Sequence, residues 1–129
     1  MTQGKNLSLM VVDDEEMNTM ILGRRLRKEG YEVLEACDGL DAISKIVSAE
    51  TRPHLILMDL MMPRLDGWEA CKQIKAKYPE IKIIAVSAKV DEEVRSQASG
   101  FDGFCSKPVN FKTMLEKVES LLPAKDGAA

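Results

Sequence analysis

The stretch that decides the fold is residues 53–67, "PHLILMDLMMPRLDG". Four consecutive apolar residues, Leu55 to Met58, run directly into Asp59, and a loop with Pro and Gly follows. A short apolar run of this kind is typical of a strand that is buried on both faces of a parallel sheet. Because such a strand has no structural need for a carboxylate at its end, Asp59 is the first candidate for a functional residue.

The composition indicates a folded, soluble domain. A chain of 129 residues is long enough to form one domain that buries roughly 70% of its unfolded surface. Hydrophobic residues make up 45% and charged residues 30%, with a net charge of -3, which argues against direct binding of nucleic acid. No stretch approaches the roughly 20 apolar residues of a membrane span, and we expect no signal peptide or membrane anchor.

The cysteines favour a reducing compartment. Cys37, Cys71 and Cys105 are odd in number, lie far apart, form no C-x-x-C pair and have apolar neighbours. All three are therefore expected to be buried, reduced thiols, and the protein is expected to be cytoplasmic.

Strand-like and helix-like segments alternate along the chain. The predicted strands are residues 7–13, 31–36, 54–59, 81–88 and 101–106. The predicted helices are about residues 15–29, 40–49, 67–78, 91–99 and 111–122. This alternation predicts an α/β fold, a doubly wound parallel sheet with helices on both faces. The folded domain spans 7–122, and the ends 1–6 and 123–129 are expected to be flexible.

Helical spacing predicts which side chains face the sheet. The expected inward residues are Asn18, Leu22 and Leu26 in the first helix, Leu40, Ile43 and Val47 in the second, and Cys71, Ile74 and Tyr78 in the third. The segment 91–99 has little apolar surface beyond Val94 and Ala98. We therefore expect it to be the helix that moves most easily.

Polar residues stand at the ends of the predicted strands. They are Asp13 and Asp14 after the first strand, Asp59 at the end of the third, Ser87 at the end of the fourth, and Ser106, Lys107 and Pro108 at the end of the fifth. Ligands of open parallel sheets bind at this edge, so these side chains should converge. Crowded carboxylates need a cation to stay ionised, and Mg²⁺ prefers such oxygen ligands. A metal ion, a Lys and a hydroxyl beside a carboxylate nucleophile suit a phosphoryl group.

In this order on these strand ends, the residues resemble a response-regulator receiver domain (CheY-like) of two-component phosphorelay signalling. The motifs that carry the resemblance are Asp13-Asp14, Asp59 within "LILMDLMMPRLDGWE", Ser87-Ala88 and Lys107-Pro108. The resemblance covers about residues 7–122. It implies a flavodoxin-like, three-layer α/β/α fold in which five parallel strands have the order 2-1-3-4-5 and are covered by five helices.

The resemblance also implies a role for each site residue. Asp59 would be the phosphoacceptor, with Lys107 and Ser87 binding the phosphoryl group. Mg²⁺ or Mn²⁺ would be held by Asp14, Asp59 and the backbone carbonyl of Met61, with Asp13 acting through water. Ser87 and Phe104 would form the switch, although Phe104 lacks a hydroxyl and would act through packing. Ala88 would leave access to the phosphoryl group, Met61 and Lys89 would tune its lifetime, and Lys107-Pro108 is a candidate cis peptide bond.

Partners and reaction class follow from the same resemblance. The phosphoryl donor would be a sensor histidine kinase or a histidine phosphotransfer protein. A downstream effector would bind the face formed by the fourth helix, the fifth strand and the fifth helix, without direct contact to nucleic acid or membrane. The protein would accept and lose the phosphoryl group on Asp59 and would not turn over a separate substrate. The residues after Lys107 fill little more than the last helix, so we expect no output domain in this chain.

Other interpretations stay open at this point. A haloacid-dehalogenase-like phosphohydrolase also uses Asp, Mg²⁺ and Lys, but its nucleophile begins a D-x-D pattern after the first strand, where this chain has Asp13, Asp14 and Glu15. A flavodoxin-like cofactor carrier would need a phosphate-binding loop there. An interaction module that has lost phosphorylation would not need the full set of residues. Taken singly, Asp59 could cap a helix, Lys107 could be a surface lysine, and Phe104 could belong to the core.

Overall fold

The computed structural model describes residues 7–62, 64–88 and 100–122. Several predictions concern residues outside this part of the chain: the flexible ends, a helix at 91–99 with Val94 and Ala98, and the expected rate-tuning role of Lys89.

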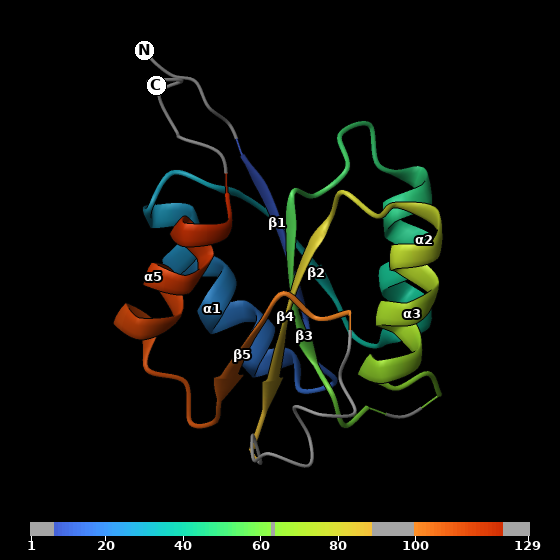
Figure 1. Cartoon of the computed structure of the whole chain (residues 1–129). Helices are drawn as coiled ribbons and strands as arrows, with labels where there is room; N and C mark the ends of the chain where they lie inside the picture. The colour runs from blue at the N-terminus through green and yellow to red at the C-terminus, as the bar shows by residue number, and fades with distance from the viewer. Residues whose placement is uncertain (1–6, 63, 89–99, 123–129) are drawn as a thin grey trace.

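Five parallel strands form one sheet in the order β2-β1-β3-β4-β5, as predicted (Figure 1). The strands are β1 (Ser8–Val12), β2 (Glu32–Ala36), β3 (Leu55–Asp59), β4 (Lys82–Ser87) and β5 (Gly103–Ser106). Val12 pairs with Met58. The residues that follow these two, Asp13 and Asp59, therefore leave the sheet side by side.

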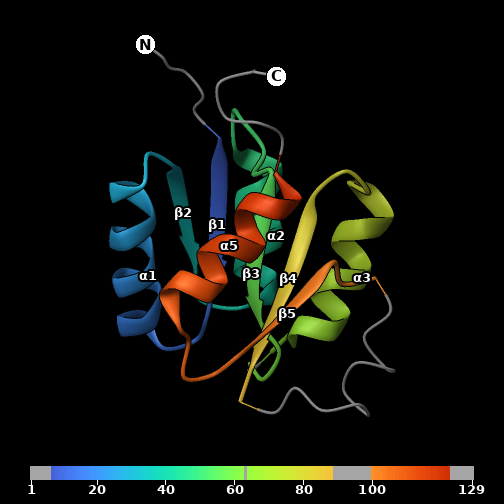
Figure 2. The same cartoon turned by 60° about the vertical axis from the view of Figure 1, so that its left-hand side comes forward.

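Helices cover both faces of the sheet and complete the predicted three layers (Figures 1 and 2). They are α1 (Glu16–Lys28), α2 (Gly39–Ser48), α3 (Gly67–Lys77) and α5 (Phe111–Leu121). The helices α1 and α5 lie on one face, and α2 and α3 lie on the other. The described part of the chain thus contains four of the five predicted helices, because the segment 91–99 is outside it.

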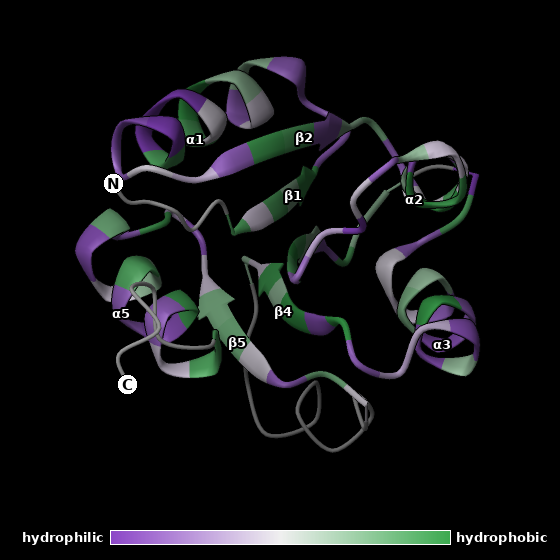
Figure 3. Ribbon diagram, turned by 90° about the horizontal axis from the view of Figure 1, so that it is seen from above, coloured by the Kyte–Doolittle hydropathy of each residue, from purple (hydrophilic) through white to green (hydrophobic). Residues whose placement is uncertain are grey.

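The sheet divides the hydrophobic core into two clusters. Alternate residues of the central strands point to opposite faces. Met10 and Ile56 pack toward α2 and α3, whereas Leu9 and Leu57 pack toward α1 and α5. All five residues of β1 and of β3 are buried, and Figure 3 shows hydrophobic residues along the central strands β1 and β4, between helices that carry both polar and apolar residues. The continuous apolar run before Asp59 therefore reflects burial on both faces.

The buried face of α2 differs from the prediction. Leu40 and Val47 are 48% and 58% exposed, while Ala42 and Ile46 face the core. The helix begins at Gly39 because the Asp38 side chain caps it by accepting a hydrogen bond from the Asp41 backbone N–H. The residues that face the sheet, Gly39, Ala42 and Ile46, therefore each lie one position before the predicted ones. The predicted Ile43 is partly buried against the core.

The inward faces of the other two helices agree better with the sequence. Cys71, Ile74 and Tyr78 of the α3 region are all buried, as predicted. In α1, Leu26 is fully buried and Leu22 packs against the core at partial burial. Thr19 and Gly23 of α1 are buried as well. The helical spacing of apolar residues does not indicate these two positions, because neither has a large apolar side chain.

The prediction that all cysteines are buried is wrong for Cys37. Cys71 and Cys105 are buried, and their burial raises the pKa of both thiols, that of Cys71 to about 11. Cys37 is exposed because it lies after the last residue of β2, in the loop that leads to the α2 cap.

Among the described residues, no helix combines the length and the hydropathy that a membrane-spanning segment needs.

Gly67 provides a test of how closely α3 packs on the end of β3. A Cβ atom at this position would overlap the Asp59 carbonyl oxygen and lie 2.9 Å from the Leu60 Cα. Since both are backbone atoms, they cannot move aside cheaply. We expect Gly67→Ala to lower the free energy of unfolding by about 1–3 kcal/mol, measured by urea denaturation.

Gly103→Ala is the matched control. A Cβ there would lie 3.6 Å from Ile84 Cγ1, an ordinary van der Waals distance. This substitution should leave stability nearly unchanged. Equal losses for the two variants would contradict the close packing at Gly67.

Candidate functional site

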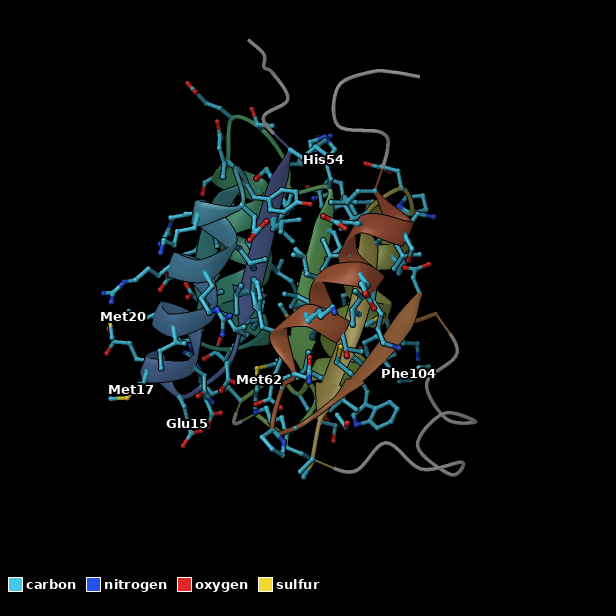
Figure 4. The ribbon with its side chains drawn as sticks, turned by 90° about the vertical axis from the view of Figure 1, so that its left-hand side faces the viewer. Glu15, Met17, Met20, His54, Met62 and Phe104 are labelled. Atoms are coloured by element: carbon cyan, nitrogen blue, oxygen red, sulfur yellow. The ribbon has the colours of Figure 1, made fainter. Side chains whose placement is uncertain are left out.

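Polar residues gather at the edge of the sheet where the parallel strands end. In Figure 4, Glu15 and Met62 lie at this edge, and His54 lies at the opposite one. β1 ends directly before Asp13, β3 ends with Asp59, and β4 ends with Ser87. Rigid neighbouring strands thus deliver these side chains to one place, as the strand-end pattern predicts.

Three carboxylates form an acidic cluster. One oxygen from each of Asp13, Asp14 and Asp59 lies within 4.8 Å of the other two. Asp13 and Asp59 are buried, at 6% and 5% exposure, whereas Asp14 is exposed. A set of hard oxygen donors that is open to solvent on one side suits a divalent cation that keeps some of its waters. The residues therefore fit a divalent metal ion.

Lys107 supplies a positive charge to the same cluster. Its Nζ lies 3.1 Å from Asp13 Oδ2 and 3.3 Å from Asp59 Oδ2. Its backbone N–H donates to the Ser87 carbonyl over 2.8 Å, and the peptide bond to Pro108 is cis. Burial alone would lower the pKa of Lys107, but the hydrogen bond to Asp13 and the charge of Asp59 outweigh it and raise the pKa. Lys107 is thus firmly cationic.

Asp59 is held in an environment that opposes its ionisation. Burial is the largest influence and raises the pKa of this carboxyl, and the nearby Asp13 charge adds to the increase. The Lys107 charge and the Met61 backbone N–H, which donates to Asp59 Oδ1 over 3.2 Å, act in the opposite direction without cancelling the effect. An additional cation at the cluster would therefore favour the ionised form.

Asn18 belongs to the site, although the sequence indicated only an inward-facing helix residue. Its side-chain amide donates to Asp13 Oδ2 over 3.2 Å and to Glu15 Oε1 over 2.9 Å. The Glu15 backbone N–H donates to the other Asp13 oxygen over 2.9 Å. These bonds fix the orientation of Asp13. The sequence could have indicated this role, because Asn18 lies in the first turn of the helix that directly follows Asp13 and Asp14.

The remaining predicted residues lie around the cluster. Ser87 is buried and pairs with Ser106 at the end of β4, one residue beyond the Val86 that pairs with Asp59. Ala88 is exposed beside it. Met61, two residues after Asp59, is 74% exposed.

Phe104 lies farther from the cluster, on the edge strand β5, where it is half-buried (Figure 4). Its ring contacts Phe101 at a centroid distance of 6.1 Å, and Phe101 contacts Trp68 edge to face at 6.0 Å. Trp68 follows Gly67, which packs on the Asp59 backbone. A continuous row of aromatic rings thus connects the start of α3 with β5.

The family model described as "Response regulator receiver domain" matches residues 9–119. The chain belongs to this family. The receiver domain contains every residue of the acidic cluster as well as Lys107.

Individual relatives agree with the family assignment. The receiver domain is 36% identical over 127 residues to the alkaline phosphatase synthesis transcriptional regulatory protein PhoP of Bacillus subtilis, a match that covers 96% of this chain and 52% of PhoP. The chain thus spans about half the length of this relative.

Solved structures resemble the receiver domain over nearly its whole length. The response regulator TrrA of Thermotoga maritima, in complex with Mg(2+)-BeF, is 33% identical with a TM-score of 0.81 and covers 90% of this chain and 99% of its own. The chemotaxis protein CheY4 of Vibrio cholerae is 27% identical with a TM-score of 0.84 and covers 91% and 99%.

The raised pKa of Asp59 has a consequence for stability. A carboxyl whose folded pKa exceeds its unfolded pKa favours the folded state when protonated, and that contribution is lost as the pH rises through the folded pKa. At neutral pH without divalent metal, the ionised Asp59 therefore destabilises the fold. We expect Asp59→Asn to raise the unfolding temperature at pH 7 in the presence of a chelator, measured by differential scanning calorimetry.

The gain should disappear toward pH 3, where Asp59 is protonated in both states of the wild type. Added Mg²⁺ should stabilise the wild type more than the variant because binding to the folded state adds to its stability. A variant that is less stable than the wild type at pH 7 would contradict the pKa assignment.

Proposed function

We propose that this receiver domain accepts a phosphoryl group on Asp59 from a sensor histidine kinase or a histidine phosphotransfer protein. The observation that carries the proposal is the placement of a buried carboxylate 3.3 Å from the Lys107 ammonium and beside two further carboxylates. Ordinary packing does not require three carboxylates at one strand edge. A site that binds a divalent cation together with an anionic group needs such carboxylates as ligands for the cation.

The metal ligands would be the side chains of Asp14 and Asp59 and the backbone carbonyl of Met61, with Asp13 acting through water. When bound, Mg²⁺ or Mn²⁺ would neutralise the carboxylates and the oxygens of the incoming phosphoryl group. Asn18 and the Glu15 N–H keep Asp13 oriented. The Met61 N–H keeps Asp59 Oδ1 oriented toward the loop.

In the transfer step, an Asp59 carboxylate oxygen would attack the phosphorus atom of the donor phosphohistidine. A new P–O bond forms as the P–N bond to the imidazole breaks, and the electron pair of that bond stays on the imidazole nitrogen. The product is an acyl phosphate on Asp59. Lys107 would exchange its contact with Asp59 for one with a phosphoryl oxygen, and the Ser87 hydroxyl would donate to another.

Access and lifetime would depend on small side chains around the site. The small, exposed Ala88 would leave the approach to Ser87 open, and the exposed Met61 lies two residues after Asp59 in the chain. Together with Lys89, which lies outside the described residues, Met61 would tune how long the phosphoryl group persists. Water would then hydrolyse the acyl phosphate on Asp59 and release phosphate. Because the hydrolysed group is attached to the protein itself, the protein would not act as a turnover enzyme on a separate substrate.

Phosphorylation would switch the face that includes β5 and α5. Movement of Ser87 toward the phosphoryl group would favour a second packing of Phe104, in a shift between two populations. A downstream effector protein would read this change on the face formed by the fourth helix, β5 and α5. A cytoplasmic location suits both partners, with no direct contact to nucleic acid or membrane.

The phosphoacceptor role can be tested with acetyl phosphate and Mg²⁺. We expect the wild type to gain the mass of one phosphoryl group and Asp59→Asn to gain none, measured by intact-protein mass spectrometry. Lys107→Ala should slow phosphorylation by about 100-fold or more, because it removes a cation placed for the developing charge.

Lys112→Ala is the matched control for the charge, since Lys112 is an exposed residue of α5. It should be phosphorylated like the wild type. Uptake by Asp59→Asn would assign the phosphoryl group to another residue. Steady hydrolysis of a phosphate ester would instead favour the haloacid-dehalogenase-like alternative.

The switch can be followed through Trp68, the chain's one tryptophan. Since Trp68 contacts Phe101, which contacts Phe104, repacking of Phe104 should change its fluorescence. We expect Mg²⁺ with beryllofluoride to change the Trp68 emission in the wild type, and Phe104→Ala to reduce that change. If the emission of Trp68 changes equally in Phe104→Ala, the change does not depend on Phe104, and the proposed coupling of Trp68 to the switch is wrong.

A further inference from the structure

The loop between β3 and α3 contains a residue in an unfavourable backbone conformation. Arg64 has a φ of 66°. This left-handed region is visited mainly by Gly, and among other residues by Asn and Asp, whereas arginine gains nothing from it locally. An interaction elsewhere must therefore keep Arg64 in place.

The Arg64 side chain supplies that interaction. Its Nε and Nη2 atoms both donate to Asp38 Oδ2, with a distance of 2.7 Å from Nε. The Asp38 side chain is only 5% exposed, and its other oxygen caps α2 by accepting from the Asp41 N–H over 2.8 Å. Burial would raise the pKa of Asp38, but the Asp41 N–H and the Arg64 guanidinium outweigh it and lower the pKa. Asp38 is thus an ionised, fixed anchor.

A second contact joins the same two loops. The Gly39 backbone N–H donates to the Leu65 carbonyl over 3.3 Å. The approach is so close that a Cβ on Gly39 would lie 2.6 Å from that oxygen. Arg64 and Leu65 are therefore fastened to the start of α2.

Near Asp59, two backbone N–H groups hold the same loop. The Met61 N–H donates to Asp59 Oδ1 over 3.2 Å, and the Gly67 N–H donates to the Leu60 carbonyl over 3.1 Å. Met61 lies in the loop that the Gly67–Leu60 bond closes, three residues before Arg64, and its side chain is 74% exposed. Its own side chain therefore does little to fix the Met61 backbone.

We propose that Arg64 is a positioning residue for the phosphorylation site, and that its ion pair with Asp38 holds the loop so that the Met61 backbone stays aligned with Asp59 and the metal ion. This inference rests on the proposed function, in which the Met61 carbonyl is a metal ligand. Arg64 touches none of the reacting atoms. It would act by restricting the loop that carries the ligand.

The stability cost of losing Arg64 is limited, because Asp38 keeps a second partner. The Arg64 side chain is 59% exposed and the Asp38 side chain is 5% exposed. Without Arg64, Asp38 Oδ1 would still accept from the Asp41 N–H, and removal of the exposed guanidinium would let water reach Oδ2, so we expect a smaller loss than for a fully buried ion pair. The geometry suits a loop whose shape matters more than its contribution to stability.

Arg64→Asn tests the inference, because Asn tolerates left-handed backbone but its side chain is too short to reproduce the arginine fork. We expect the dissociation constant for Mg²⁺ to rise about tenfold, measured by isothermal titration calorimetry. In phosphorylation by acetyl phosphate, the Mg²⁺ concentration for half-maximal rate should rise by the same factor. The midpoint of urea denaturation should stay close to that of the wild type.

Two further variants sharpen the result. Asp38→Asn can still cap α2 but loses the charge that pairs with Arg64, so it should weaken Mg²⁺ binding in the same way. Its effect should not add to that of Arg64→Asn in the double variant, because both remove one interaction. Arg24→Gln removes an exposed arginine from α1 and should bind Mg²⁺ like the wild type.

The outcomes distinguish this inference from the function on which it rests. If Arg64→Asn binds Mg²⁺ within twofold of the wild type, or only its stability falls, the positioning role is wrong while phosphorylation of Asp59 can stand. If the wild type binds no Mg²⁺ and takes up no phosphoryl group, the proposed function fails, and the positioning role fails with it.

Discussion

The contact on which the rest of the site depends is the one between the Lys107 ammonium and the two buried carboxylates of Asp13 and Asp59. Buried carboxylates this close repel each other, and one ammonium cannot balance the charge of three acidic groups. The cluster is therefore electrostatically incomplete by itself. That deficit of positive charge suits the site to a divalent cation, and in the proposed function the flexible lysine side chain would follow an incoming anion.

The scaffold makes this unfavourable arrangement possible. Strands β1 and β3 are buried along their whole length, so the backbone positions before Asp13 and Asp59 cannot relax to separate the charges. The hydrophobic burial of the central strands offsets the electrostatic cost at their ends. The elements that follow the strands then orient the carboxylates: Asn18 of α1 donates to Asp13, and the Met61 backbone N–H in the loop after β3 donates to Asp59.

The parts that could be predicted from the sequence are those set by periodicity and strand ends. Asp59 and Lys107 were identifiable because apolar runs end at them, and parallel topology brings such ends together. Asn18 and the Arg64–Asp38 pair were not, because single side-chain hydrogen bonds that involve loop residues leave no periodic pattern. The predicted inward face of α2 was wrong by one residue. The Asp38 cap and the close contact of Gly39 with Leu65 fix where this helix begins, and spacing rules take neither into account. Cys37 was misassigned because apolar neighbours in sequence do not ensure burial in a loop.

The division of the core by the sheet has a consequence for how substitutions combine. The cluster under α2 and α3 and the cluster under α1 and α5 are composed of different side chains, with the sheet backbone between them. Energetic coupling between residues requires contact or a shared partner. Changes in one half of the interior should therefore add to changes in the other half as independent increments. The two faces of the molecule can accumulate sequence differences separately, provided that the strand ends stay intact.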